Sequence, residues 1–361
     1  MSVGATVGVE EEFHLVDPKS GELRSGARRL LAVDPEAAHG AEAELRLSMI
    51  ETASAVCHGL DELRRDLAMR RAELAAAAQE AGLAIAGCGS VPGSGTGRGA
   101  VFPDARYEWM AGQYRRLVDE HQVCAMQVQV GVPDRDLAVR LMAHLRPWLP
   151  VLLAMSGSSP LFQHGDTGYD SYRTVAISRW PTTGPPPLVD TAAEYDEAVR
   201  ALVGTGVISD PGMIYFDVRP SARYPTLEIR VADACPLLDD VVLIAALARA
   251  LVTTAAGSGP DGPLPTYPLN RAATWRAARS GLDDGLVHPV DWHEVPAGEA
   301  VEALLTHVRP ALEERGEWAA ARGLTTALLA RGTSARRQRA ALTAGGDFTA
   351  VVASVIAETT G

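Results

Sequence analysis

The chain has 361 residues, with 47% hydrophobic and 22% charged residues. This composition is ordinary for a globular protein that forms one large domain or two smaller ones. The net charge is −12 and the pI is near 5.3, which excludes a protein that grips nucleic acid through a clustered positive surface.

The four cysteines are far apart and form no CxxC pair. They predict small buried thiols in a reducing compartment rather than disulfides or a zinc site. The first eight residues lack the charged and apolar regions of a signal peptide. The longest apolar run, Val241 to Ala256, contains Arg249 and is shorter than the ~20 residues of a membrane span. We therefore expect a cytoplasmic protein without membrane association.

Three consecutive glutamates, Glu10 to Glu12, lie inside the apolar stretch Val7–Val16. The stretch is typical of a β-strand, so Glu10 and Glu12 share one face and Glu11 takes the other. Two like charges on one face repel unless a cation lies between them, and carboxylate oxygens are ligands of Mg²⁺. The residues leave two interpretations open: a divalent-cation site, or a solvated edge strand whose charges discourage aggregation.

The remaining chain alternates irregularly between helices and strands, which indicates an α+β fold. Asp134 is a plausible helix cap, and Pro147 and Pro150 should break the helix that follows. The expected helices cover 61–81, 191–203 and 239–256, the last begun by Asp239 or Asp240, and the expected strands cover 83–86, 123–132, 214–218 and 226–232. Residues 87–99 and 156–187 are predicted loops, and residues 257–268 are a candidate linker.

Four strand-like segments carry acidic or amide side chains. They are Glu10 to Glu12, Glu44 to Glu51, Met126 to Gly131 with Gln127 and Gln129, and Tyr224 to Val231 with Glu228 and Arg230. Each segment alone is more typical of polar side chains that occur on any sheet, but together the four segments favour a polynuclear metal site. Phosphoryl transfer needs such a site, because Mg²⁺ offsets the charge of ATP phosphates. Candidate partners for phosphoryl or carboxylate oxygens are Arg173, Arg179, Arg219, Arg223 and Arg230.

With these residues in view, the chain resembles the carboxylate–amine ligase family, the bacterial type-2 glutamate–cysteine ligases, from about Val7 to the C-terminal helices. The motifs that carry the resemblance are Gly8 to Phe13; Glu44 with Glu51 to Ser54; Val132 to Asp136; Leu145 to Pro150; Asp166 to Tyr169 with Ser171 to Arg173; Arg179 to Pro181; Asp217 to Ser221; and Thr226 to Val231.

The resemblance implies a glutamine-synthetase or guanido-kinase-like fold, in which an antiparallel, saddle-shaped sheet has helices packed on one side. It implies one catalytic domain over residues 1–361, mostly helical from about residue 269, and a homodimer. It also implies that Mg²⁺ and ATP activate a carboxylate, typically the γ-carboxylate of glutamate, as an acyl phosphate. An amine such as that of cysteine then attacks.

Carried over by motif, the resemblance assigns a role to each polar segment. The metal ligands would be Glu10, Glu12, Glu44, Glu51 and Glu228. Arg230 would contact the phosphates and act in catalysis together with Arg173, and Gln127 and Gln129 would contribute to cofactor binding. The substrate carboxylates would be bound by Arg173 and Arg219, with Tyr172 beside them.

The chain departs from the family pattern at two places. It has Gln127 and Gln129 where His-x-His is common, although plant-type and ergothioneine-pathway relatives look similar here with Gln-x-Asn. It also has the apolar Leu47 and Met49 around Ser48. A non-catalytic relative that binds nucleotide or a partner subunit is therefore an alternative to an active ligase. A guanidino-kinase-like phosphotransferase is a third possibility, by fold analogy alone.

Overall fold

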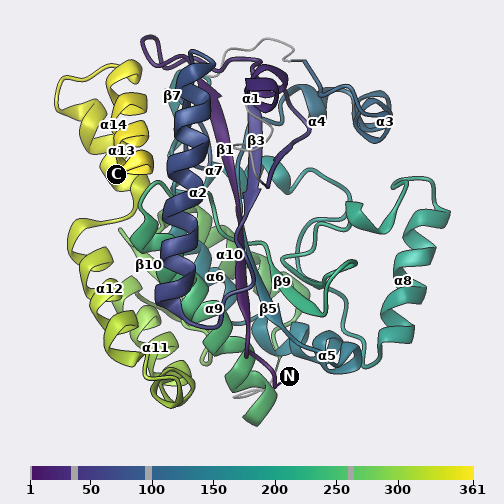
Figure 1. Cartoon of the computed structure of the whole chain (residues 1–361). Coiled ribbons are helices and arrows are strands. Elements are labelled where there is room, and N and C mark those ends of the chain that lie inside the picture. Colours follow the sequence, from purple (N-terminus) through teal and green to yellow (C-terminus); the bar gives the residue numbers. More distant parts are fainter. Residues whose placement is uncertain (1, 34–39, 94–99, 259–263) are drawn as a thin grey trace.

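The computed structural model describes residues 2–33, 40–93, 100–258 and 264–361. Its centre is an antiparallel sheet with the strand order β2-β3-β1-β5-β9-β8, and β4 also pairs with β1 (Figure 1). This arrangement confirms the predicted α+β class. The strands are β1 (Val7–Val16), β2 (Ala41–Ala43), β3 (Met49–Ala53), β4 (Ala84–Ala86), β5 (Met126–Gly131), β8 (Val218–Pro220) and β9 (Thr226–Ile229).

The predicted strand Val7–Val16 is β1, and its alternation is as expected. Glu12 pairs with Glu51 on β3, and Glu10 pairs with Gln127 on β5. Glu11 points to the opposite face, where its carboxylate meets the guanidinium of Arg71 at 2.6 Å. A central strand with neighbours on both sides is not an edge strand, so the solvated-edge interpretation of the three glutamates is wrong.

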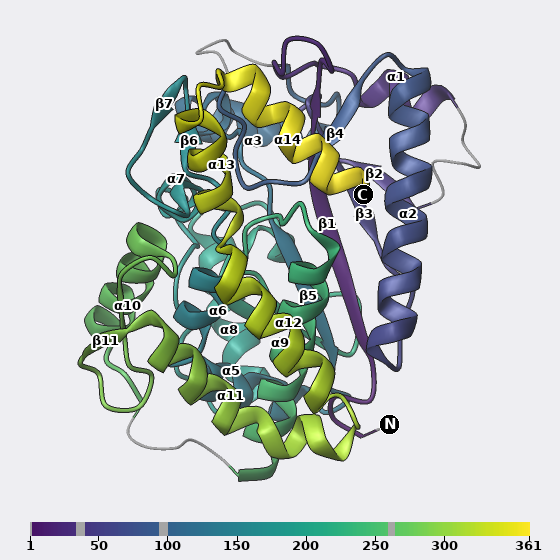
Figure 2. The same cartoon turned by 90° about the vertical axis from the view of Figure 1, so that its left-hand side faces the viewer.

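Helices cover the face of the sheet to which Glu11 points (Figures 1 and 2). The main ones are α2 (Leu60–Glu80), α9 (Leu238–Ser258) and α14 (Phe348–Thr360). The apolar run Val241 to Ala256 is part of a longer helix than expected, because α9 has 21 residues and is therefore long enough to cross a membrane. However, 78% of its apolar window is buried inside the fold. Long and apolar as it is, α9 serves as a core helix.

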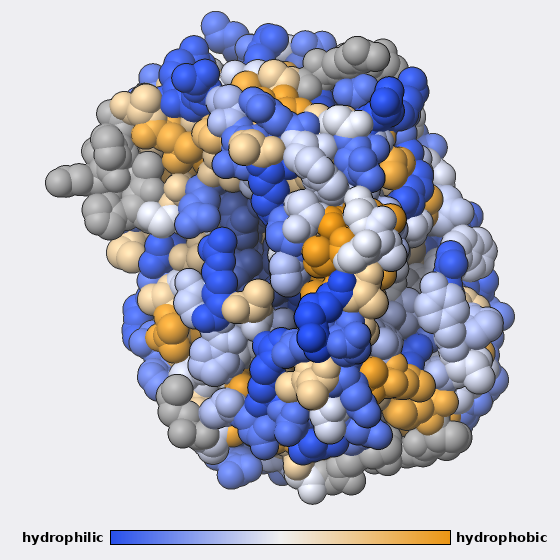
Figure 3. Space-filling view, turned by 90° about the vertical axis from the view of Figure 1, so that its right-hand side faces the viewer, coloured by the Kyte–Doolittle hydropathy of each residue, from blue (hydrophilic) through white to orange (hydrophobic). Residues whose placement is uncertain are grey.

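The opposite face of the sheet is open at its centre. Figure 3 shows this side of the molecule, hollowed and lined largely by hydrophilic residues. On this side of the molecule lie α3 (Ala105–Tyr114), α4 (Arg116–Asp119), α5 (Arg135–Leu145), α7 (Tyr172–Ile177), α8 (Ala192–Gly204) and the 3₁₀ turn η1 (Pro211–Met213). The helix α6 (Leu149–Ser156) is buried and packs against α9. As predicted, Asp134 caps α5 by accepting hydrogen bonds from the backbone of Asp136 and Leu137, and the chain bends by 71° between α5 and α6.

Two predicted strands are wrong in detail. Glu44 to Glu51 is not one strand, because the chain turns between β2 and β3 and leaves Glu44 in that turn. The strand expected at 214–218 begins only at Val218. The preceding carbonyls of Gly212 and Ile214 accept hydrogen bonds from Arg219 instead of from a neighbouring strand.

The predicted loop 156–187 contains short elements that its lack of periodicity hid. These are β6 (Leu161–Phe162), β7 (Gly165–Asp166) and α7, which Ser171 caps. In the predicted loop 87–99, residues 94–99 lie outside the described residues, as do residues 34–39 and, within the candidate linker, 259–263. The other elements are α1 (Ala27–Val33), α10 (Tyr267–Ser280), β10 (Gly285–Val287), β11 (Glu294–Pro296), α11 (Ala297–Glu314), α12 (Trp318–Arg331) and α13 (Ser334–Thr343).

One buried histidine of β1 should make the stability of the protein sensitive to acid. His14 is fully buried, and burial lowers its pKa to about 4. The unfolded chain takes up this proton near pH 6.5, so His14 should cost stability as the pH falls from about 6.5 towards 4, by up to about 3 kcal/mol. Urea unfolding of the wild type and His14→Met between pH 7.5 and 4.5 checks this. Parallel pH profiles for the two proteins would contradict it.

Candidate active site

The register of the sheet gathers the predicted polar residues on the open face. Residues that face each other across antiparallel strands point to the same side. Besides the two pairs made by β1, Gln129 faces Glu228, and Glu228 faces Arg219. The open face thus has an acidic half over β1 and β3 and an arginine-containing half over β8 and β9, with the two glutamines of β5 between them.

The acidic half consists of Glu10, Glu12, Glu44 and Glu51. The carboxyl group of Glu51 is within hydrogen-bonding reach of those of Glu10 and Glu44. Burial, followed by the charges of Glu44 and Glu12, raises the pKa of Glu51 well above its usual value. Burial and the charge of Glu44 raise the pKa of Glu12 to about 7. Carboxyl groups gathered in this way favour a proton or a cation between them.

The two glutamines connect the halves of the site. Gln127 Nε2 donates to Glu12 Oε1 at 3.1 Å, and Gln127 Oε1 accepts a hydrogen bond from Arg230. Gln129 Nε2 donates to Glu10 Oε1 at 3.0 Å, and its Oε1 accepts from Thr226 Oγ1 at 2.6 Å. The amides therefore donate hydrogen bonds to the carboxylates of Glu10 and Glu12 and fix their orientation. Histidines are common at these two positions in the family, and the unprotonated nitrogen of a histidine ring cannot donate.

The arginine half is built around Glu228. Arg219 donates to both of its carboxylate oxygens, at 3.2 and 3.1 Å, and Arg230 donates to Oε1. Burial alone would raise the pKa of Glu228, but Arg230 and Arg219 lower it to about 2. Glu228 is therefore ionised and paired. Arg230 faces the acidic half as well, because it also contacts Gln127.

The predicted residues of α7 lie farther along the site. Arg173 donates to the backbone carbonyls of Arg230 and Val231, at 2.9 and 3.2 Å, and lies 3.5 Å from Asp233. These contacts hold the end of β9 in place, so a substrate role for Arg173 stays a prediction. Tyr172 contacts Phe162 and Tyr169 through its ring and is not brought together with the carboxylates by any of these contacts.

Carboxylate oxygens suit Mg²⁺, and the mutual approach of Glu10, Glu44 and Glu51 fits a bound cation. The described residues nevertheless contain no group of three His, Cys, Asp or Glu side chains already arranged to hold a metal ion. Glu228 in particular is occupied by the two arginines. The carboxylates must shift to become a complete set of ligands, and their role as such stays a prediction.

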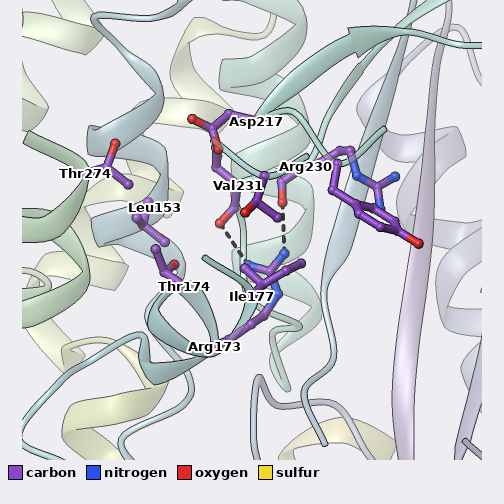
Figure 4. Close-up of a pocket in the computed structure, with 10 residues that line it drawn as sticks. Leu153, Arg173, Thr174, Ile177, Asp217, Arg230, Val231 and Thr274 are labelled. Atoms are coloured by element: carbon purple, nitrogen blue, oxygen red, sulfur yellow. Dashed lines mark hydrogen bonds between the residues drawn. The ribbon is translucent and has the colours of Figure 1, made fainter. Parts of the chain in front are cut away.

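Several residues of this face escaped the sequence analysis. Glu42 on β2 lies directly opposite Glu51, and the alternation Ala41-Glu42-Ala43-Glu44 was the available signal. Tyr215 lies beneath Arg230, with 5.9 Å between the guanidinium carbon and the ring centre. Asp217 lines a pocket next to Arg230 (Figure 4). Asp217 lies in the motif Asp217 to Ser221 but was given no role there, and nothing local marks Tyr215, because elements far apart in the sequence create the surroundings of both.

The fold is that of the glutamate–cysteine ligases. A solved structure from Francisella tularensis, described as a glutamate–cysteine ligase in complex with AMP, matches with a TM-score of 0.75 at 10% identity, over 99% of this chain and 89% of that one. The model of glutamate–cysteine ligase family 2 matches residues 6–354. The chain belongs to glutamate–cysteine ligase family 2.

Two relatives support this membership. A protein of Mycolicibacterium smegmatis named "Putative glutamate--cysteine ligase 2-2" is 44% identical over 98% of this chain and 90% of its own length. One of Rhodococcus jostii named "Putative glutamate--cysteine ligase 2-3" is 47% identical over 98% of this chain. The chain spans 45% of the length of the Rhodococcus relative. The resemblance inferred from the sequence motifs is thereby confirmed at the level of the family.

Proposed function

We propose that the protein is an ATP-dependent carboxylate–amine ligase that joins the γ-carboxylate of glutamate to the amine of an amino acid such as cysteine. The observation that carries the proposal is the open sheet face, where four gathered carboxyl groups lie across two glutamines from Arg230. An acidic half suits Mg²⁺, and an adjacent arginine suits the phosphates that Mg²⁺ accompanies. The name and bound AMP of the Francisella structure agree with the use of a nucleotide.

In the reaction, a carboxylate oxygen of the donor attacks the γ-phosphorus of ATP, and ADP leaves. The amine nitrogen then attacks the acyl carbon, loses a proton and displaces phosphate. Arg230 would stabilise the charge on the transferred phosphoryl oxygens. Gln127 and Gln129 would hold Glu12 and Glu10 in position.

Mg²⁺, when bound, would neutralise phosphate charge and orient the phosphoryl group for transfer. Glu10, Glu12, Glu44 and Glu51 would hold it, with Glu228 if its arginines release it. The chain's own contribution is then largely electrostatic and positional, which is what phosphoryl transfer demands.

The change Glu10→Gln tests this proposal. We expect Mg²⁺-dependent ADP release, in the presence of glutamate and cysteine or a pool of other amino acids, to fall at least ~100-fold, because one ligand and one charge are lost. Burial and the charge of Glu228 raise the pKa of Glu10, so its neutralisation should not lower the melting temperature. Glu80→Gln, at an exposed position at the end of α2, is the matched control.

ADP release that requires both a carboxylate and an amine would support a ligase, and omitting pool members singly would identify the acceptor. Wild-type release no greater than that of Glu10→Gln would overturn the proposal and favour a non-catalytic relative. A stable phosphorylated product without amide formation would indicate a phosphotransferase.

A further inference from the structure

A small pocket opens beside Arg230, where the residues before β8 and after β9 meet α6, α7 and α10. Its cavity volume is about 40 Å³. One water requires a cavity of about 10–15 Å³, so the pocket accommodates a small group and not a nucleotide. The contact to Gln127 places the guanidinium of Arg230 at the open face, and Figure 4 shows it pointing away from Leu153 and Thr174 across the pocket. The pocket therefore lies next to the candidate active site, and the guanidinium of Arg230 that would bind phosphates lies outside the pocket.

Asp217 is the acidic group of this pocket, and its backbone is fixed on both sides. Its N–H donates to the carbonyl of Gly184 at 2.9 Å, and its carbonyl accepts from the N–H of Arg230 at 2.9 Å. Within the described residues, no group donates a hydrogen bond to its carboxylate. Burial raises the pKa of Asp217 to about 6, against the effect of Arg173 and Arg146, so the group is mostly ionised at neutral pH.

Two threonine hydroxyls of the pocket are available only as acceptors. Thr183 Oγ1 donates its proton to the carbonyl of Trp180 at 2.8 Å, and Thr274 Oγ1 donates to the carbonyl of Asn270 at 3.1 Å. A hydroxyl whose proton is engaged still offers its lone pairs. Together with the Asp217 carboxylate, the pocket thus offers several acceptors from three separate segments.

Two arginines line the pocket, Arg230, whose guanidinium is turned to the open face, and Arg173, which is already engaged. Arg173 donates to the carbonyls of Arg230 and Val231 and lies beside Asp233. The pocket therefore combines acceptor oxygens with little free donor capacity. An ammonium group has three donors, one positive charge and no acceptor, so it matches this lining where a carboxylate or phosphate does not.

We propose that the Asp217 pocket is a subsite for a primary ammonium group of a substrate, bound by the Asp217 carboxylate and the hydroxyl oxygens of Thr183 and Thr274. The inference rests on the proposed function, since both substrates of such a ligase carry an ammonium group. The group belongs either to the carboxylate donor or to the amine acceptor. The pocket then selects amino acids over simple carboxylic acids, or primary amines over uncharged nucleophiles.

Calorimetric titration with two matched ligand pairs tests the subsite. The first pair is L-glutamate and glutarate, and the second is L-cysteine and 3-mercaptopropionate; each second member lacks the ammonium group. Titrations contain Mg²⁺ and a non-hydrolysable ATP analogue, and compare the wild type with Asp217→Asn and Thr274→Val. Asp190→Asn, at an exposed position outside the pocket, is the matched control.

We expect Asp217→Asn to weaken one ammonium-bearing ligand by about tenfold to a hundredfold, the range of a charge-assisted hydrogen bond, and Thr274→Val to weaken the same ligand several-fold. Loss for glutamate alone identifies the donor subsite, and loss for cysteine alone the acceptor subsite. Three results would overturn the subsite. The wild type could bind both members of each ligand pair equally, it could bind none of the ligands, or Asp217→Asn and Thr274→Val could both bind them with wild-type affinity. ADP release by the same wild-type sample reports separately on the proposed function.

Discussion

Replacing Arg230 by Met should lower kcat/KM for ATP about a thousandfold. The guanidinium contacts Glu228 and Gln127 at the junction of the acidic and arginine halves, where charge on a transferred phosphoryl group would develop. Loss of one preorganised donor to such charge typically costs 10²- to 10³-fold, and arginines that act on phosphoryl transfer reach the upper end or beyond. Steady-state ADP release at varied ATP concentrations measures the effect.

Two further variants make the Arg230 result interpretable. Arg230→Lys keeps the charge but loses the planar fork, and it should recover only part of the activity. Arg219→Met removes the other arginine on Glu228, which is also tied to the carbonyls of Gly212 and Ile214, and should lower the melting temperature more than Arg230→Met does. Near wild-type turnover in Arg230→Met would remove Arg230 from the catalytic machinery.

Replacing Arg71 by Met should lower the free energy of unfolding by about 3–5 kcal/mol. Arg71 and Glu11 are 4% and 2% exposed, and their charged groups meet at 2.6 Å. Arg71 also donates to the carbonyls of Cys235, Pro236 and Thr359. Removing one partner of a buried pair leaves an uncompensated charge, which is the costly step. Chemical denaturation followed by circular dichroism measures the loss.

The double variant Glu11→Met with Arg71→Met separates charge from packing. If the uncompensated Glu11 carboxylate causes the loss, the double variant should be more stable than Arg71→Met alone, since a buried ion pair can often be replaced by apolar groups at little cost. A double variant as unstable as the single one would assign the effect to the lost carbonyl contacts of Arg71.

The sequence predicted best where side-chain pattern and backbone geometry coincide. The alternation in Val7–Val16 placed Glu10 and Glu12 on one face and Glu11 on the other, and the structure agrees. The cap at Asp134 and the break near Pro147 were also predictable, because both depend on neighbours within a few residues. The apolar Met49, a concern in the sequence, is buried with Cys124 and Ala234, and Leu47 packs at the edge of a separate core with Ile50.

The remaining features depend on contacts that no local pattern encodes. The turn after Glu44 has no Gly or Pro to announce it, so Glu44 was placed on a strand. The role of the amides depends on the position of Gln127 between Glu12 and Arg230, which strands far apart in the sequence create. The Asp217 pocket brings the residue before β8 together with threonines at 183 and 274, and such a meeting is a property of the fold rather than of any segment.

The strand order has a consequence for synthesis on the ribosome. β1 to β4 are complete once Ala86 has been made, and α2 already lies between β3 and β4 in the sequence. β8 and β9, which bring Arg219 and Arg230, begin only at Val218. Arg71, the partner of Glu11, is made early, but at translation rates of roughly 5–20 residues per second the open-face glutamates of β1 and β3 precede Arg219 and Arg230 by several seconds or more. During that interval protons or cations from the surroundings can balance their charge, so ionic conditions should influence how the emerging chain folds.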